Sequence, residues 1–133
     1  QASDLIAAAA CMAMYLVALP APDYAPVPLM EIHGTADDVV PYDWDMDDTA
    51  EVFPTAIRNV ETWARINGCA GSPVVTGGPS AHATFTRFGE CKNGADVVLL
   101  TLDGVGHLPY LGIQTDVDTA RVAWEFMREF SRP

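Results

Sequence analysis

Basic residues are scarce in this chain. Its 133 residues include 7 Lys and Arg against 18 Asp and Glu, which gives a net charge of -11 at neutral pH. Such a surface repels the phosphates of nucleic acid and the head groups of an anionic bilayer. We therefore expect neither nucleic acid nor a membrane as a partner. The acidic stretch at 43–51 lacks the glycine that a calcium-binding loop carries at its sixth position, so we expect a solvated loop there and no metal.

The sequence also has no apolar run long enough to span a bilayer. Residues 5–19 are apolar but too short to span a bilayer, and Gln1 to Asp4 precede them where a signal peptide would have a basic stretch. We interpret residues 6–19 as a buried strand with its exit loop, broken by Pro20 and Pro22. Because 50% of all residues are hydrophobic, the chain can bury one core, and we expect a single domain over residues 1–133.

Cysteine is limited to three residues, and none of them forms a closely spaced metal-binding pair. A disulfide between Cys69 and Cys91 is the simplest interpretation, and it would close a loop of roughly 20 residues and stabilise the fold by about 3 kcal/mol. Two free buried thiols remain an alternative, and a zinc site completed by His82 is a poorer one. Cys11 has no assigned role. A disulfide would indicate an oxidising compartment, so we expect a secreted or periplasmic protein.

The remaining pattern alternates between strands and helices. Apolar runs predict strands at 27–33, 83–88 and 96–102, in addition to the one within 6–19. A helix is expected from Pro54 to about Ile66, and a second one after a cap at Asp116 or Thr115. We expect a surface connection over 69–80, a turn at 92–94, and core positions for Trp63 and Trp124. The order predicts an α/β layer fold with a mostly parallel sheet and flanking helices.

Two loops that follow buried strands carry candidate catalytic groups. In parallel sheets, such groups gather beyond the carboxyl ends of strands. Asp37 follows one strand closely, and His107 follows another. Asp38 could take the place of Asp37 if the turn were shifted by one residue. His33, at a strand end, is expected to be structural, and His82 has no assigned role.

Four segments resemble a known family. They are PLMEIHGTADDVVPY, NVETWARINGC, the later Cys91-Lys92-Asn93-Gly94, and DVVLLTLDGVGH. Together they resemble the C-terminal half of secreted hydrolases of the polyhydroxybutyrate depolymerase-like and feruloyl-esterase-like type, over about residues 4–130. The resemblance implies a partial α/β-hydrolase fold, Asp37 as triad acid, His107 as triad base, and a structural disulfide between Cys69 and Cys91.

The same resemblance implies carboxylic ester hydrolysis through an acyl-enzyme, without a metal or an organic cofactor. The substrate would be an ester with an aromatic or a hydroxyalkanoate acyl group. Tyr42 and Trp44 lie beside the expected acid, and Leu108 follows the expected base, so these three could line the substrate pocket.

The chain departs from this family in one respect. It has no GxSxG nucleophile elbow, and none of its serines lies in such a motif: Ser3, Ser72, Ser80 and Ser131. One hypothesis is an esterase whose Ser belongs to an N-terminal half that this chain lacks. The alternative is a noncatalytic remnant that acts as an oligomerising or interaction module. Both predict association, with a complementary half or a second copy, because a divided sheet exposes an edge and apolar area.

Overall fold

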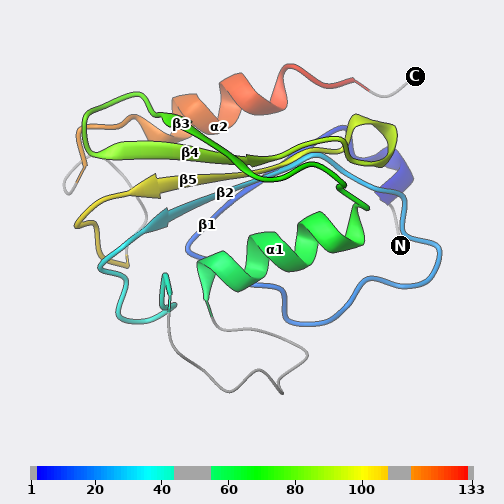
Figure 1. Ribbon diagram of the computed structural model, residues 1–133, viewed down its shortest axis with the longest axis horizontal. Helices are drawn as coiled ribbons and strands as arrows, with labels where there is room; N and C mark the ends of the chain where they lie inside the picture. The colour runs from blue at the N-terminus through cyan, green and yellow to red at the C-terminus, as the bar shows by residue number, and fades with distance from the viewer. Residues whose placement is uncertain (1–2, 44–54, 108–114, 132–133) are drawn as a thin grey trace.

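The computed structural model describes residues 3–43, 55–107 and 115–131, which form one five-stranded sheet with a helix on each face (Figure 1). The strand order is β1-β2-β5-β4-β3. The strands are β1 (Ala9–Met12), β2 (Leu29–Gly34), β3 (Val74–Gly77), β4 (Ala83–Phe88) and β5 (Val97–Leu102). The helices are α1 (Ala56–Ile66) and α2 (Thr119–Met127), with two short 3-10 turns, η1 (Ser3–Leu5) and η2 (Lys92–Gly94).

The expected α/β class is confirmed, but the sheet is mixed. Strands β1, β2 and β5 are parallel to one another, whereas β4 runs antiparallel to both β5 and β3. The antiparallel part is a hairpin whose first strand, β3, lies within the segment 69–80 that we expected to be a surface connection. All four β3 residues are exposed, and Val74 and Val75 form too short an apolar run between flanking Pro and Gly to identify a strand.

The core lies on both faces of the central strands β2 and β5. Every residue of β2 is buried, as the apolar run predicts for a strand covered on both sides. Alternate side chains point to opposite faces, and α1 covers one face while α2 covers the other (Figure 1). The α1 side contains Leu29, Val97 and Leu99, and the α2 side contains Met30, Ile32, Val98 and Leu100.

Helix α1 ends where the sequence predicts. Its first N–H groups are capped by Thr55, whose side chain accepts a hydrogen bond from Arg58 N at 3.2 Å. Its last residue is Ile66, and the chain then turns through Asn67 and Gly68, which has a φ of 66°. The Asn-Gly pair is therefore the stop signal that it resembles.

Buried Asn67 joins the end of α1 to the sheet. Its Nδ2 donates to Val27 O at 2.9 Å and to Ala95 O at 2.8 Å, and its Oδ1 accepts from Tyr24 Oη at 3.1 Å. Val27 and Ala95 precede β2 and β5, so one amide satisfies backbone groups at the start of two strands.

The expected disulfide between Cys69 and Cys91 is present and lies beside this junction. It links the residue that follows the α1 turn to the start of η2, 22 residues further along the chain. Cys11 is a free thiol. The disulfide therefore fixes the end of α1 to the segment that leads into β5.

Two expectations about the last helix are wrong. Helix α2 begins at Thr119 with Asp118 as its cap, since Asp118 Oδ1 accepts from Arg121 N at 3.0 Å, and not at Asp116 or Thr115. Trp124 is 61% exposed although its helical spacing placed it in the core. Within the described ranges, no helix has both the length and the apolar character that crossing a bilayer requires.

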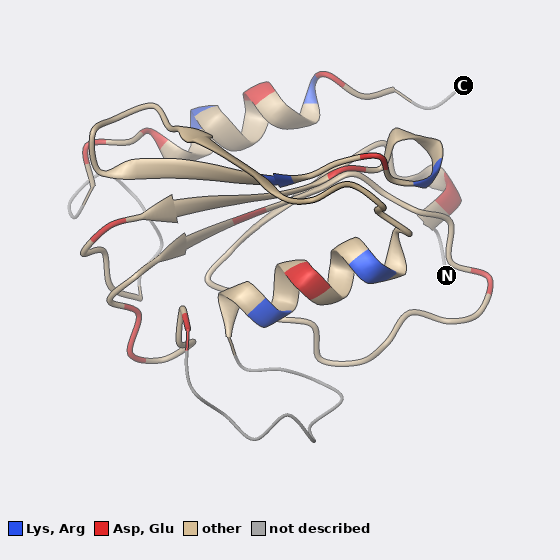
Figure 2. Ribbon diagram, viewed as in Figure 1, with Lys and Arg blue, Asp and Glu red and all other residues tan. Residues whose placement is uncertain are grey.

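Among the described residues, acidic side chains occur in many of the loops, and basic side chains lie mainly on the helices and at one end of the sheet (Figure 2).

Candidate active site

The site lies where β2 and β5 end. These strands are parallel neighbours, and their registers place Gly34 opposite Leu102, so the loops that follow leave the sheet side by side (Figure 1). The first loop carries Asp37, and the second carries His107. This is the edge at which parallel sheets collect catalytic groups.

Gly34 allows the two loops to touch. A Cβ atom added at Gly34 would lie 2.0 Å from Val105 O and 2.6 Å from Val105 C, which no side chain tolerates. The close approach permits backbone hydrogen bonds from Thr35 N to Leu102 O and from Ala36 N to Val105 O, both at 2.9 Å. The glycine is therefore required by packing, and it brings the Asp37 loop against the His107 loop.

The Thr35 side chain forms a second connection between the Asp37 loop and the His107 loop. Its hydroxyl donates to Asp103 Oδ1 at 3.2 Å and accepts from Gly104 N at 2.8 Å. Gly104 has a φ of 70°, a conformation that L-residues rarely adopt, and it turns the chain toward His107. These contacts fix the loop geometry without any contribution from the side chains of Asp37 or His107.

Asp37 and His107 form a hydrogen-bonded pair. Asp37 is buried, and its Oδ2 lies 2.9 Å from His107 Nδ1. Its other oxygen, Oδ1, accepts from Val39 N at 2.9 Å and from Val40 N at 2.8 Å, which fixes the carboxylate plane. Both oxygens are therefore used, and one of them points to the imidazole.

The surroundings of Asp37 favour its ionised form. Burial opposes the charge, but the backbone N–H of Val40, the His107 imidazole, the N–H of Val39 and the nearby His33 together outweigh burial. They hold the pKa of the Asp37 carboxyl below its ordinary value. An ionised carboxylate only accepts hydrogen bonds, so His107 Nδ1 must carry the proton between them.

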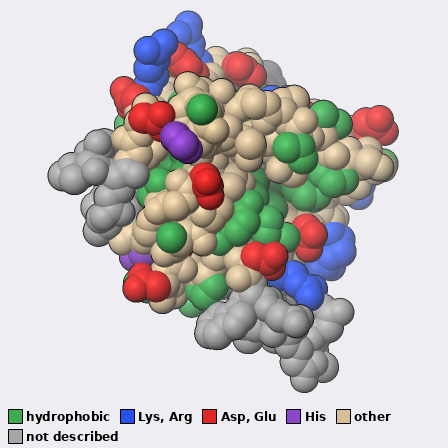
Figure 3. All heavy atoms as spheres, turned by 60° about the vertical axis from the view of Figure 1, so that its left-hand side comes forward, with side chains coloured by type: hydrophobic (Ala, Val, Ile, Leu, Met, Phe, Trp, Pro, Cys, Tyr) green, Lys and Arg blue, Asp and Glu red, His purple; other side chains and the backbone are tan. Residues whose placement is uncertain are grey.

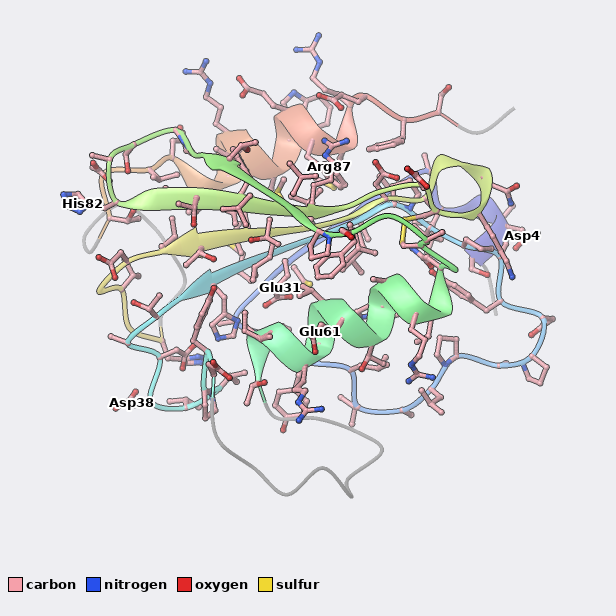
Figure 4. The ribbon with its side chains drawn as sticks, viewed as in Figure 1. Asp4, Glu31, Asp38, Glu61, His82 and Arg87 are labelled. Carbon is pink, nitrogen blue, oxygen red and sulfur yellow. A yellow bond between two sulfur atoms is a disulfide. The ribbon has the colours of Figure 1, made fainter. Side chains whose placement is uncertain are left out.

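This assignment leaves Nε2 of His107 as the basic nitrogen. The His107 side chain is 34% exposed, and its Nε2 makes no hydrogen bond to the residues that the structure describes. Asp38, the alternative acid, is exposed on the same loop and points away from the sheet (Figure 4). The geometry pairs His107 with Asp37 and not with Asp38.

Figure 3 turns the end of the molecule that lies on the left in Figure 1 toward the viewer. Hydrophobic side chains gather near the centre of this face, and several Asp and Glu side chains surround them.

Two buried side chains, Glu31 and His33, lie behind Asp37, and the sequence pattern did not predict a catalytic role for either. His33 Nε2 lies 3.1 Å from Asp37 Oδ2 and 2.7 Å from Val40 O, and His33 Nδ1 lies 2.9 Å from Glu31 Oε1. Both Glu31 and His33 have no exposed surface. The sequence does contain one indication of this pair: a charged residue and a histidine stand two positions apart in an otherwise apolar strand, so both lie on one face of the sheet.

The candidate pocket residues are only partly described. The Tyr42 hydroxyl lies 2.7 Å from Thr101 Oγ1, and the Tyr42 ring packs edge-on against His33. Trp44 and Leu108 lie outside the described residues. Within the described ranges, no three side chains of His, Cys, Asp or Glu are grouped so that they could hold a metal ion.

The serines of the chain lie mostly far from His107. Ser3 precedes β1, Ser72 precedes β3, and Ser131 follows α2, all at the end of the sheet opposite the Asp37–His107 pair. Ser80 is the exception, because the β3–β4 turn that contains it lies at the same end of the sheet as the Asp37–His107 pair, and its Oγ accepts from His82 N at 3.2 Å. Its context, Gly78-Pro79-Ser80-Ala81-His82, lacks the second glycine of an elbow and leads into a strand instead of a helix.

Comparison with known proteins identifies an esterase relative. No protein-family model matches the chain. Feruloyl esterase B of Piromyces equi is 32% identical to it over 112 residues, which make up 81% of this chain and 19% of that protein. The chain therefore spans about a fifth of the length of this curated relative. Over most of its own length it is similar to one part of an esterase.

Proposed function

We propose that this chain supplies the acid and the base of a carboxylic ester hydrolase of the Ser-Asp-His type, with the Ser on a segment outside these 133 residues. The observation that carries the proposal is the pair itself. A buried, doubly anchored Asp37 holds Nδ1 of a half-exposed His107, whose Nε2 remains available. A similar constellation serves acyl transfer on several unrelated folds.

In the proposed reaction, His107 Nε2 takes the proton from the Ser hydroxyl while the Ser oxygen attacks the acyl carbon of the ester. The imidazolium then returns that proton to the departing alkoxide, which leaves an acyl-enzyme. A water molecule then gives a proton to the same Nε2 as its oxygen attacks the acyl carbon. The bond from the acyl carbon to the Ser oxygen breaks, the imidazolium returns the proton to that oxygen, and the carboxylic acid is released. Asp37 stays ionised throughout, keeps the proton on Nδ1, and stabilises the imidazolium.

The name of the relative supports a proposal for the acyl group of the substrate. Feruloyl esterase B is named for an aromatic acyl ester. We propose an aromatic acyl ester as the substrate in preference to a hydroxyalkanoate, and the Cys69–Cys91 disulfide supports a secreted or periplasmic location.

The open edge of β1 is the proposed contact for the segment that carries the Ser. Ala9 N and Ala13 N donate to β2 and its extension, at Pro28 O and Ile32 O, so the backbone groups of Ala10 and Met12 point away from the sheet. No described strand pairs with that edge. Exposed apolar side chains flank it: Leu5, Ile6, Met14, Tyr15, Val17 and Leu19. Such an edge suits a further parallel strand.

The same edge favours a second candidate function, a noncatalytic module that binds another chain or a second copy of itself. Light scattering at micromolar concentration tests the docking proposal that both functions share. We expect a dimer or larger particle for the chain alone, and a 1:1 complex when a Ser-bearing half is added. A compact monomer that binds no such half would show that the β1 edge is not an interface.

Activity separates the two functions. The chain should not hydrolyse p-nitrophenyl acetate or methyl ferulate alone, and it should do so when joined to a segment that carries a GxSxG elbow. In the joined protein, His107→Ala should lower kcat by a factor on the order of 10⁵ to 10⁶, and Asp37→Asn by nearly as much, on the order of 10⁴. Asp38→Asn is the matched control and should change kcat little.

Ser80→Ala tests the nucleophile within the chain. Turnover by the chain alone that disappears in Ser80→Ala would show that the nucleophile is internal. Full activity of the joined His107→Ala protein would show that His107 is not the base.

A further inference from the structure

A buried polar chain continues behind Asp37 into the sheet. Glu31 and His33 alternate with apolar residues of β2 and share the face of Leu29, which α1 covers. Figure 4 shows Glu31 between the sheet and this helix. Neither has exposed surface, and every buried polar side-chain atom in the described ranges has a partner. Ionisable groups are rarely buried without compensation, so their hydrogen bonds decide their charge.

All the partners of Glu31 on the α1 side are donors. Its Oε1 accepts from Met14 N at 3.2 Å, and its Oε2 lies 2.6 Å from Cys11 Sγ and 3.4 Å from Asn59 Nδ2. The Asn59 amide orientation is fixed because Leu16 N donates to Asn59 Oδ1 at 3.0 Å. Burial and the neighbouring Glu31 charge raise the pKa of the Cys11 thiol, so Cys11 keeps its proton. These donors meet both Glu31 oxygens, an arrangement that favours the carboxylate.

Beside an ionised Glu31, His33 is placed to carry a proton on both nitrogens. Its Nε2 faces Val40 O and Asp37 Oδ2, and its Nδ1 faces Glu31 Oε1, all of which are acceptors. Burial opposes this charge. The hydrogen bond to Glu31, the carbonyl of Val40 and the two carboxylates outweigh burial and raise the pKa of His33 above its ordinary value.

We propose that Glu31 and His33 are positioning residues of the active site. Glu31 keeps His33 as an imidazolium, and His33 holds Asp37 Oδ2 in place opposite His107. This inference rests on the proposed function for its role in catalysis, but the arrangement of protons is a property of the chain itself. Three hydrogen-bond donors then hold the two carboxylate oxygens of Asp37: Val39 N, Val40 N and His107 Nδ1. The His33 imidazolium, whose Nε2 donates to Val40 O, lies 3.1 Å from Asp37 Oδ2 and adds an ion pair.

The charge of Glu31 explains why His33 can be a cation beside a catalytic acid. An uncompensated imidazolium next to Asp37 would cancel the negative charge that His107 needs when it becomes protonated. Glu31 neutralises His33 from the other side, so Asp37 keeps its net negative charge. Replacing Glu31 by Gln removes the reason for the second proton on His33, which should then become a neutral imidazole that retains the proton on Nε2 for Val40 O.

Imidazole NMR of the chain alone tests the proposal. The chain has three histidines, His33, His82 and His107, so their ¹⁵N signals can be assigned by substitution, with exposed His82 as the reference. We expect both His33 nitrogens to be protonated at pH 7, and a slowly exchanging, far-downfield proton on His107 Nδ1. A neutral, singly protonated His33 in the unmodified chain at pH 6 would overturn the proposal without any variant.

The variant test compares Glu31→Gln with Glu61→Gln, the same change at an exposed position of α1 (Figure 4). Glu31→Gln should give His33 the ¹⁵N shifts of a neutral ring at pH 7 and increase the exchange rate of the His107 Nδ1 proton about tenfold or more. Glu61→Gln should change neither signal. Unchanged His33 and His107 signals in a folded Glu31→Gln chain would overturn the positioning role.

The joined, Ser-bearing protein gives an independent readout. There Glu31→Gln should lower kcat about tenfold or more with KM nearly unchanged, since substrate contacts are untouched. Absence of esterase activity in the joined wild type would contradict the proposed function. The proton arrangement would then be tested by the imidazole NMR of the chain alone. Full kcat in Glu31→Gln would contradict positioning.

Discussion

Adding one methyl group at Gly34 should separate the two halves of the site. The new Cβ would lie 2.0 Å from Val105 O, whereas ordinary contacts begin at about 3.4 Å, so the 102–107 loop must move by roughly 1 Å or more. Because the clash is with backbone, trimming the Val105 side chain would not relieve it. The shift should lengthen the 2.9 Å contact between Asp37 and His107 and break the bond from Ala36 N to Val105 O.

The magnitude follows from overpacking a tight site. We expect Gly34→Ala to destabilise the chain by about 1–3 kcal/mol, or roughly 3–5 °C of Tm for each kcal/mol in a domain of this size. A misplacement of about 1 Å at the catalytic base should cost about 10²-fold in kcat in the joined protein. Thermal unfolding measures the first effect, and the His107 Nδ1 proton signal reports the second in the chain alone.

Gly77→Ala is the matched control. A Cβ at Gly77 in β3 meets nothing within 4 Å, so this change should leave Tm and the His107 signal unaltered. A Gly34→Ala chain with the Tm and the His107 spectrum of the wild type would refute the close-approach argument.

Four further outcomes are expected. Cys69→Ser with Cys91→Ser should lower the free energy of unfolding by about 3 kcal/mol in urea, and non-reduced peptide mapping of the wild type should yield the linked pair, whereas two alkylatable thiols would exclude it. Asn67→Leu should lower the free energy of unfolding by about 2–5 kcal/mol, because the carbonyls of Val27 and Ala95 would be buried without a donor. A loss below about 1 kcal/mol would show that water replaces the amide. Since the pKa of Asp37 is lowered, its stabilisation should be complete above about pH 4 and be lost as the pH falls further, a decline that Asp37→Asn should lack. Since the pKa of His33 is raised, its contribution should be complete below about pH 6.5 and be lost as the pH rises through the raised value, a decline that urea titrations should not find in Glu31→Gln.

The sequence predicts the elements whose signal is local. Buried strands β2 and β5 are continuous apolar runs, and α1 has helical spacing with an Asn67-Gly68 stop, so their positions could be read within a few residues. Strand β3 could not, because an exposed edge strand is held by backbone pairing with β4, which leaves no apolar period. Helix α2 starts later than predicted because Asp118 caps it, whereas the Thr115 hydroxyl accepts from Val117 N ahead of the helix.

The sequence predicts only those features of the candidate site that depend on where a residue lies relative to a strand. Asp37 and His107 each follow a strand, and parallel strands end together, so their proximity could be expected. The choice of Asp37 over Asp38 needs the turn geometry, in which Val39 N and Val40 N select one carboxylate. The role of Glu31 could not be predicted, because its hydrogen-bond donors Cys11, Met14 and Asn59 are distant in the sequence. A hydrophobic pattern does not reveal such partners.

The disulfide and the Asp37–His107 pair lie at opposite ends of β5. Six strand residues, or about 20 Å, separate the segment after Cys91 from the loop of His107. Covalent reinforcement therefore acts where the strand enters the sheet, and proton transfer is proposed where it leaves. A reducing agent should then shift the unfolding temperature while the imidazole of a still-folded chain keeps its hydrogen bond. In this architecture, resistance to unfolding can change during evolution without disturbing the groups proposed to perform the chemistry.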